Sequence, residues 1–127
     1  MIYGIGIDLV EPGRVARLLD KYGERFARRV LTPLEWPAYL KTTRPVLFLA
    51  NRFAAKEAFS KAMGTGFRYP VTLQCISVVQ NRAGKPGLEF HPNLAALVRS
   101  RGIVGHHLTI SDEAVLACAC VVLEAEA

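Results

Sequence analysis

Two carboxylates, Asp8 and Glu57, are the first candidates for chemistry, and Asp8 lies at the end of an apolar segment, where a negative charge needs a partner. Asp8 follows Gly4 and Gly6 in GIGIDLVE, and Glu57 lies in NRFAAKEAFSKAM. Two carboxylates with retained water suit Mg²⁺, which prefers oxygen ligands and gives up its waters reluctantly. The sequence alone does not show that the two meet. Asp8 could instead cap a strand end, and Glu57 could pair with Lys61 one helical turn later.

A lysine followed by a glycine-rich segment forms a second candidate site. Lys61 comes one turn before Gly64-Thr65-Gly66, so an ammonium group and backbone N–H donors could bind phosphate together. The segment follows a predicted helix, whereas P-loops and dinucleotide-binding loops precede one, so neither of those classes is supported. The alternative is an ordinary helix C-cap with a lysine near the negative end of the helix dipole.

Three polar residues, His107, Thr109 and Ser111, alternate along one face of a predicted strand and could form the polar edge of a pocket. A Ser/His/Asp triad could be drawn with Asp112. No GxSxG nucleophile elbow surrounds the serine, which disfavours hydrolytic chemistry of that kind.

Basic residues are concentrated in the first half of the chain. Residues 1–66 hold 11 Lys and Arg against 6 Asp and Glu, whereas residues 67–127 hold 5 of each. This excess predicts an anionic partner, such as a phosphate cofactor, an acidic protein or nucleic acid. The candidate contacts with such a partner are Arg14, Arg17, Lys21, Arg25 and Phe26. A non-catalytic basic module that binds RNA or an acidic protein is the rival interpretation, although no RNP pattern or GXXG loop is present.

Hydrophobic periodicity predicts the elements that must position these residues. Residues 2–10 alternate as a strand with Gly4, Gly6 and Asp8 on one face, and two glycines there indicate close approach by another backbone. Helical spacing predicts helices over 12–22 and 46–63.

The later elements are less regular. A capping box, Thr32-Pro33-Leu34-Glu35, predicts a short helix with proline at its first position. The remaining predicted elements are strands over 71–80 and 87–90, which form a hairpin, a helix over 93–100, and strands over 107–112 and 114–123. This order predicts an α+β fold with an antiparallel sheet packed against helices.

The composition, 51% hydrophobic and 21% charged over 127 residues, is typical of one globular domain, residues 1–127. The positive mean hydropathy favours an oligomer. The three cysteines form no CxxC pattern, so neither a disulfide framework nor a zinc site is supported. The first residues resemble no signal peptide, and no run of ~18 apolar residues is present, so we expect a cytoplasmic protein.

Three segments, in this order, resemble the signature motifs of the holo-[acyl-carrier-protein] synthases, the small 4′-phosphopantetheinyl transferases of bacteria. They are GIGIDLVE at 4–11, RFAAKEAFSKAMGTG at 52–66 and HLTISDE at 107–113. Further matches at 25–32 and 84–86 extend the resemblance over almost the whole chain. It implies an α+β transferase fold, typically a homotrimer with active sites between subunits. It also implies Mg²⁺-dependent transfer of 4′-phosphopantetheine from coenzyme A to a serine of apo acyl carrier protein, which releases adenosine 3′,5′-bisphosphate and serves fatty acid biosynthesis.

The resemblance also implies roles for single residues. Asp8 and Glu57 would bind Mg²⁺ with the coenzyme A diphosphate, and Lys61 would donate a proton to the leaving group. Glu57 would take the serine proton, directly or through a metal-bound water. The residues expected around coenzyme A are Arg52, Lys56, Lys61, Gly64, Thr65, Gly66, His107, Thr109 and Ser111, the last three from a neighbouring subunit. The expected docking surface for the carrier protein is Arg14, Arg17, Lys21, Arg25 and Phe26. Neither nucleic acid nor a membrane is an expected partner.

Overall fold

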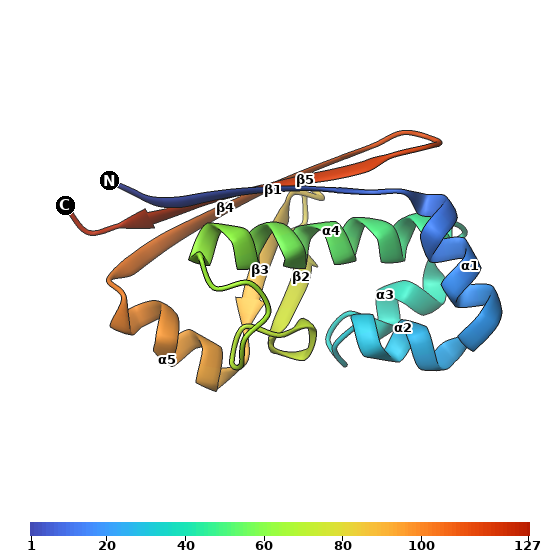
Figure 1. Ribbon diagram of the computed structural model, residues 1–127, viewed down its shortest axis with the longest axis horizontal. Coiled ribbons are helices and arrows are strands. Elements are labelled where there is room, and N and C mark those ends of the chain that lie inside the picture. The colour runs from blue at the N-terminus through green and yellow to red at the C-terminus, as the bar shows by residue number, and fades with distance from the viewer.

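Helix α4 (Pro45–Met63) runs through the middle of the molecule, between a three-stranded sheet and the remaining elements (Figure 1). The computed structural model describes residues 1–127. The sheet contains β1 (Ile2–Val10), β5 (Ala117–Ala125) and β4 (Ile103–Asp112), in that order, and both pairs are antiparallel. The predicted α+β class with an antiparallel sheet is therefore confirmed.

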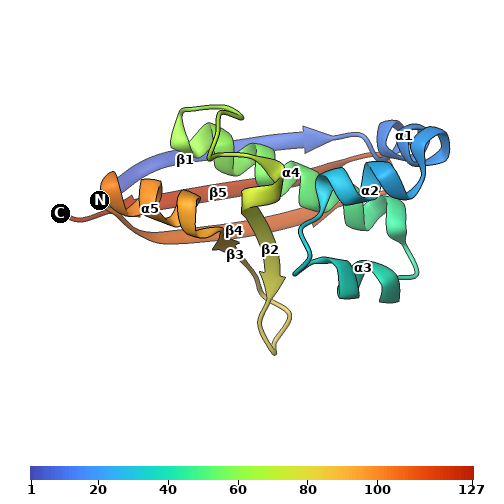
Figure 2. The same cartoon turned by 90° about the horizontal axis from the view of Figure 1, so that it is seen from below.

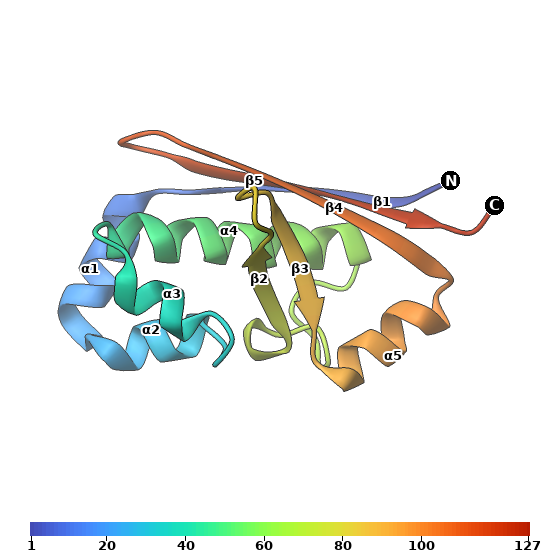
Figure 3. The same ribbon diagram turned by 180° about the vertical axis from the view of Figure 1, so that it is seen from behind.

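The other elements surround the opposite side and the two ends of α4. Helices α1 (Pro12–Tyr22), α2 (Glu24–Val30) and α3 (Trp36–Lys41) gather at one end, and α5 (Pro92–Ser100) lies at the other (Figure 2). The hairpin of β2 (Ile76–Gln80) and β3 (Pro86–Phe90) crosses beside α4 between these groups (Figure 3). None of the helices combines the length and the apolar character needed to cross a membrane.

Two glycines allow β1 to lie directly on α4. A Cβ atom at Gly4 would stand 2.0 Å from the carbonyl oxygen of Ala62, and one at Gly6 would stand 1.8 Å from that of Ala58. The close backbone approach predicted from the glycines is confirmed. Because Asp8 points to the same side of the strand, it also faces α4.

Helix α4 also joins two apolar clusters. Ala58 and Phe59 pack in the larger cluster with the strands, whereas Leu49 and Ala50 pack in the smaller one with Val30 of α2. Small alanine side chains allow close contact on both sides of the helix. The helix that carries Glu57 and Lys61 is thus packed into both apolar clusters.

Several predicted elements differ in the structure. Strand β4 begins at Ile103 and not at 107, β5 spans Ala117–Ala125 and not 114–123, and helix α2 was not predicted. The strand predicted over 71–80 begins at Ile76, because β3 has only five residues and pairs with none of residues 71–75. Leu73–Cys75 instead form a 3₁₀ turn, η1. The segment Thr32–Glu35 is a turn, and helix α3 begins only at Trp36.

The capping box forms only in part. Glu35 accepts a hydrogen bond from the backbone N–H of Thr32 at 2.9 Å, as in such a box. The Thr32 hydroxyl, however, pairs with the hydroxyl of Ser77 at 2.6 Å and caps no helix. The Thr32 hydroxyl therefore makes a hydrogen bond to a distant segment in place of the local helix cap.

Candidate active site

Asp8 of β1 and Glu57 and Lys61 of α4 line one cavity of about 320 Å³ at the junction of β1, α1 and α4. The sequence left open whether the two carboxylates lie at one site, and in the structure both line this cavity. Arg14 of α1 lies at the same cavity. The cavity therefore combines two acids with two fixed positive charges.

The position of Asp8 follows from the strand register. Asp8 pairs with Ala119 of β5, on the inner face of the sheet, and its side chain is only 15% exposed. The ammonium group of Lys61 donates to Asp8 Oδ1 at 3.1 Å and to the carbonyl oxygen of Ile7 at 3.0 Å. Lys61 itself is half exposed, so its side chain can also reach a ligand in the cavity.

The surroundings of Glu57 disfavour the ionised form of its carboxyl group. Burial raises the pKa of the Glu57 carboxyl, the nearby Asp8 carboxylate raises this pKa further, and the Lys61 ammonium opposes both effects. A carboxylate that is disfavoured in its charged form binds protons or cations more readily than a free glutamate. Both a general base and a cation ligand are compatible with this position.

Apart from Phe26, the apolar wall of the cavity was not singled out from the sequence. It consists of Leu9, Val10, Val15, Leu18, Phe26 and Phe53. Val15 and Leu18 share the apolar face of the helix predicted over 12–22, yet Val15 is buried and Leu18 is 38% exposed at the cavity. Periodicity identifies an apolar face and does not tell whether that face lines a core or a cavity.

The segment Gly64-Thr65-Gly66 is a helix C-cap. Gly64 has a left-handed backbone with φ of 76°, and the N–H groups of Thr65 and Gly66 both reach the Ser60 carbonyl oxygen at 3.3 Å. The alternative interpretation of this segment is thus confirmed. Its exposed glycines still leave the backbone open to a close ligand, and a phosphate site here stays a prediction.

The structure leaves Lys56 no free donor for coenzyme A. Its side chain is fully buried and its ammonium group has used all three donors, on Val30 O at 2.5 Å, Glu35 Oε1 at 2.7 Å and Leu73 O at 3.0 Å. Burial lowers the pKa of Lys56, and the Glu35 carboxylate opposes this shift. Residues 52–66 read as one motif, but helical geometry directs Lys56 away from the Glu57 and Lys61 side.

Arg52 lies at a second cavity of about 440 Å³, on another side of α4. Its guanidinium lies over the ring of Phe48 at 3.9 Å, and its Nε stands 3.6 Å from a Glu35 oxygen. Lys41 and Arg44, which sequence reasoning missed, line the same cavity. Three cations around one polar cavity favour an anionic ligand.

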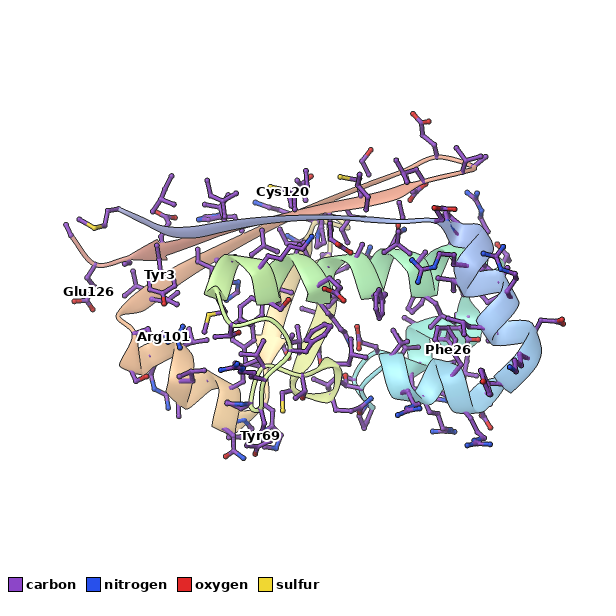
Figure 4. The ribbon with its side chains drawn as sticks, in the orientation of Figure 1. Tyr3, Phe26, Tyr69, Arg101, Cys120 and Glu126 are labelled. Atoms are coloured by element: carbon purple, nitrogen blue, oxygen red, sulfur yellow. The ribbon has the colours of Figure 1, made fainter.

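His107, Thr109 and Ser111 lie on the outer face of the sheet, away from α4, and all three are exposed. Thr109 aligns across the sheet with Cys120 and Ile7, and Figure 4 shows Cys120 pointing outward. Within one chain these three polar residues are therefore on the opposite side of the sheet from Asp8. His107 Nε2 contacts the Glu124 carboxylate on β5.

The predicted docking residues are exposed on α1 and α2, apart from the half-buried Phe26. Arg25 and Phe26 line a third cavity of about 430 Å³, which shares Leu18, Phe26 and Phe53 with the first. A basic surface with an apolar centre thus continues into the cavity that holds Asp8 and Glu57. Such a surface complements an acidic amphipathic partner.

Comparison with known proteins shows the relationship. Residues 4–119 match the family described as the 4′-phosphopantetheinyl transferase superfamily. The chain belongs to this superfamily. A holo-[acyl-carrier-protein] synthase of Nitrosospira multiformis is 62% identical over 124 residues, which cover 98% of this chain and 99% of that protein.

Solved structures of superfamily proteins have the same fold. The crystal structure of a holo-[acyl-carrier-protein] synthase from Neisseria meningitidis has a TM-score of 0.95 at 44% identity and covers 98% of this chain and 99% of that one. A holo-(acyl-carrier-protein) synthase from Bacillus anthracis, in complex with CoA (3′,5′-ADP), has a TM-score of 0.82 at 40% identity, with 99% of each chain covered. All residues that line the first cavity of this superfamily member lie within the matched segment 4–119.

Proposed function

We propose that this protein transfers 4′-phosphopantetheine from coenzyme A to a serine of an apo acyl carrier protein. The observation that carries the proposal is the first cavity, where Asp8, Glu57 and Lys61 meet beside an exposed basic helix face. Acids and a lysine together suit phosphoryl chemistry, in which negative charge gathers on oxygen atoms. The high identity to synthases over the full chain supports the same reaction.

The donor set of the cavity fits Mg²⁺. Two carboxylates and one lysine line the same cavity, and the raised pKa of Glu57, to which the Asp8 carboxylate contributes, marks a place where added positive charge is stabilising. Asp8 and Glu57 would hold the ion, and the remaining ligands would be water and phosphate oxygens. When bound, the ion would neutralise charge on the reacting phosphate.

The side chains of this chain supply the other functions. Glu57 accepts the proton of the carrier serine as its oxygen bonds to the β-phosphorus, a role that a raised pKa favours. The bond from this phosphorus to the bridging oxygen breaks, and adenosine 3′,5′-bisphosphate leaves. Lys61, which lines the same cavity and donates to Asp8, would bind and protonate the leaving oxygen. Gly64, Thr65 and Gly66 follow within one turn and offer the chain of coenzyme A a close approach.

The basic surface of Arg14, Arg17, Lys21 and Arg25, together with the half-buried Phe26, receives the acidic carrier. Arg14 lines the catalytic cavity itself, so a carrier held by this surface brings its serine to Glu57. Such a contact raises the rate of association and weakens with salt, because exposed charges are screened within ~8 Å at physiological ionic strength.

The outer face of the sheet supports a homotrimer with shared active sites. Ile5, Ile7 and Leu9 are 57–59% exposed there, which is an unusual apolar surface for a monomer. A neighbouring copy would cover it and bring His107, Thr109 and Ser111 to the nucleotide end of coenzyme A. Arg52, with its neighbours in the second cavity, would bind the phosphates of that end.

The expected setting follows from the reaction. Holo carrier protein is the form that fatty acid biosynthesis uses, and the enzyme would act in the cytoplasm on residues 1–127 as one domain. The contribution of α4 to both apolar clusters supports a single unit.

The direct test is mass spectrometry of an apo acyl carrier protein incubated with this protein, coenzyme A and Mg²⁺. A mass gain of one phosphopantetheine group, lost with EDTA, is the expected result. The matched control replaces Asp8 by alanine. No gain with any carrier, together with no binding of coenzyme A, would overturn the proposal and favour a non-catalytic basic module.

A further inference from the structure

Helix α2 carries two of the proposed docking residues, Arg25 and Phe26, yet it has only seven residues. A helix of this length is unstable alone, and the last four carbonyl groups of any helix lack partners within it. The position of α2 therefore depends on contacts from outside. Those contacts are concentrated at its C-terminal end.

Two side chains bind four consecutive carbonyl groups at this end. The amide Nε2 of Gln74, on η1, lies 2.9 Å from Arg28 O, 3.0 Å from Arg29 O and 3.0 Å from Leu31 O, so its two N–H groups serve three carbonyls and one N–H is shared between two of them. Lys56 Nζ, on α4, donates to the carbonyl between them, Val30 O, at 2.5 Å. We call Gln74 and Lys56 the α2 clamp.

The clamp connects the docking helix to the catalytic helix. Lys56 immediately precedes Glu57, so the turn of α4 that directs Glu57 into the first cavity also holds α2. Lys56 also binds Leu73 O, beside Gln74, and this bond fixes η1 against both helices. Phe26 of α2 lines the first cavity, so a tilt of α2 would move the docking surface and the cavity wall together.

We propose that Gln74 is a positioning residue for carrier-protein recognition. It acts through the end of α2, and it sets the orientation of Arg25 and Phe26 relative to Glu57. The proposal rests on the proposed function. Gln74 does not line the first or the second cavity, so it would affect neither the chemistry nor the binding of coenzyme A directly.

Gln74 is the better member of the clamp to test, because its side chain is exposed and its replacement leaves no buried charge unpaired. Gln74→Leu keeps the size and removes the donor. Gln74→Lys restores a donor, and its positive charge suits a helix C-terminus. The matched control is Ser100→Ala, which removes a comparable bond from Ser100 Oγ to Leu97 O at the end of α5, far from α2.

Steady-state kinetics with apo carrier protein and coenzyme A is the first measurement. We expect Gln74→Leu to raise the KM for the carrier about fivefold. This is the factor expected when the docking helix loses the stabilisation of roughly one net hydrogen bond that holds it ready for the carrier. The KM for coenzyme A should stay within about twofold, and Gln74→Lys should recover most of the carrier KM. A merely stabilising role would lower the active fraction and leave both KM values unchanged.

Hydrogen exchange of the α2 amides is the second measurement and needs no turnover. Gln74→Leu should speed exchange in residues 24–31, and Ser100→Ala should not. Equal changes in both KM values, an unchanged carrier KM, or unchanged exchange in α2 would each overturn the proposal. If the wild-type protein transfers nothing, the proposed function fails, and carrier affinity by calorimetry with the exchange data then decides the role of Gln74.

Discussion

Replacing Gly6 by alanine tests whether the contact between β1 and α4 both stabilises the fold and positions the catalytic carboxylate. The added Cβ would stand 1.8 Å from the carbonyl oxygen of Ala58 and 2.7 Å from the backbone nitrogen of Ala62. Both neighbours are backbone atoms of a long helix, so no side-chain rotation relieves the clash. The strand must move outward by about 1.2 Å, from 1.8 Å to the 3.0 Å below which Cβ contacts essentially never occur.

Such overpacking costs roughly 1–3 kcal/mol, and we expect the upper end because the obstacle is rigid backbone. For a domain of this length each kcal/mol lowers Tm by about 3–4 °C, so Tm should fall by about 10 °C. Asp8 lies two residues further along the same face, so a displacement near 1 Å should also lower kcat by about 100-fold.

The control is Gly87→Ala on β3, a strand glycine with no atom within 4 Å of an added Cβ. Calorimetry and the transfer assay should show it close to wild type. Equal Tm values for Gly6→Ala and Gly87→Ala would refute the packing argument. A large loss of Tm with unchanged kcat would refute the link between this contact and the position of Asp8.

Four further changes test the site. Asp8→Ala should abolish transfer while circular dichroism stays native, and normal activity at saturating Mg²⁺ would contradict a ligand role. Glu57→Gln should also abolish transfer, yet raise Tm at neutral pH. Because the pKa of Glu57 is raised in the folded protein, ionisation of this carboxyl destabilises the fold above its unfolded pKa of about 4.3. The gain in Tm should therefore vanish when Tm is measured below that pH. The double change Arg14→Glu and Lys21→Glu should raise the KM for the carrier at least about tenfold with little effect on coenzyme A, and equal shifts would place docking elsewhere. Lys56→Met should lower the free energy of unfolding by about 3–5 kcal/mol in urea titrations, because the buried Glu35 carboxylate loses its nearer cation at 2.7 Å and keeps only Arg52 Nε at 3.6 Å. A change under about 1 kcal/mol would contradict a structural role for Lys56.

Local pattern was a reliable guide where the element is long or its contacts are close in sequence. The helix over 46–63 and the strand over 2–10 were predicted nearly to their observed bounds. The glycines of β1 correctly indicated close backbone approach, because no other residue leaves space for a carbonyl oxygen. Local pattern failed over 71–75 and 32–35, where pairing partners and buried hydrogen bonds from distant segments decide the conformation.

The candidate site divides in the same way. Residue types and spacing alone pointed to Asp8, Glu57 and Lys61 as oxygen ligands and a phosphate-binding cation. Only the tertiary structure showed that the three meet in one cavity and that Lys56, inside the same motif, turns into the core to bind Glu35. The sequence determines which side chains each element carries and on which face of a helix each side chain lies. The packing of β1 on α4, and of α2 on the buried side of α4, decides which of them face one another, because those contacts join residues far apart in the chain.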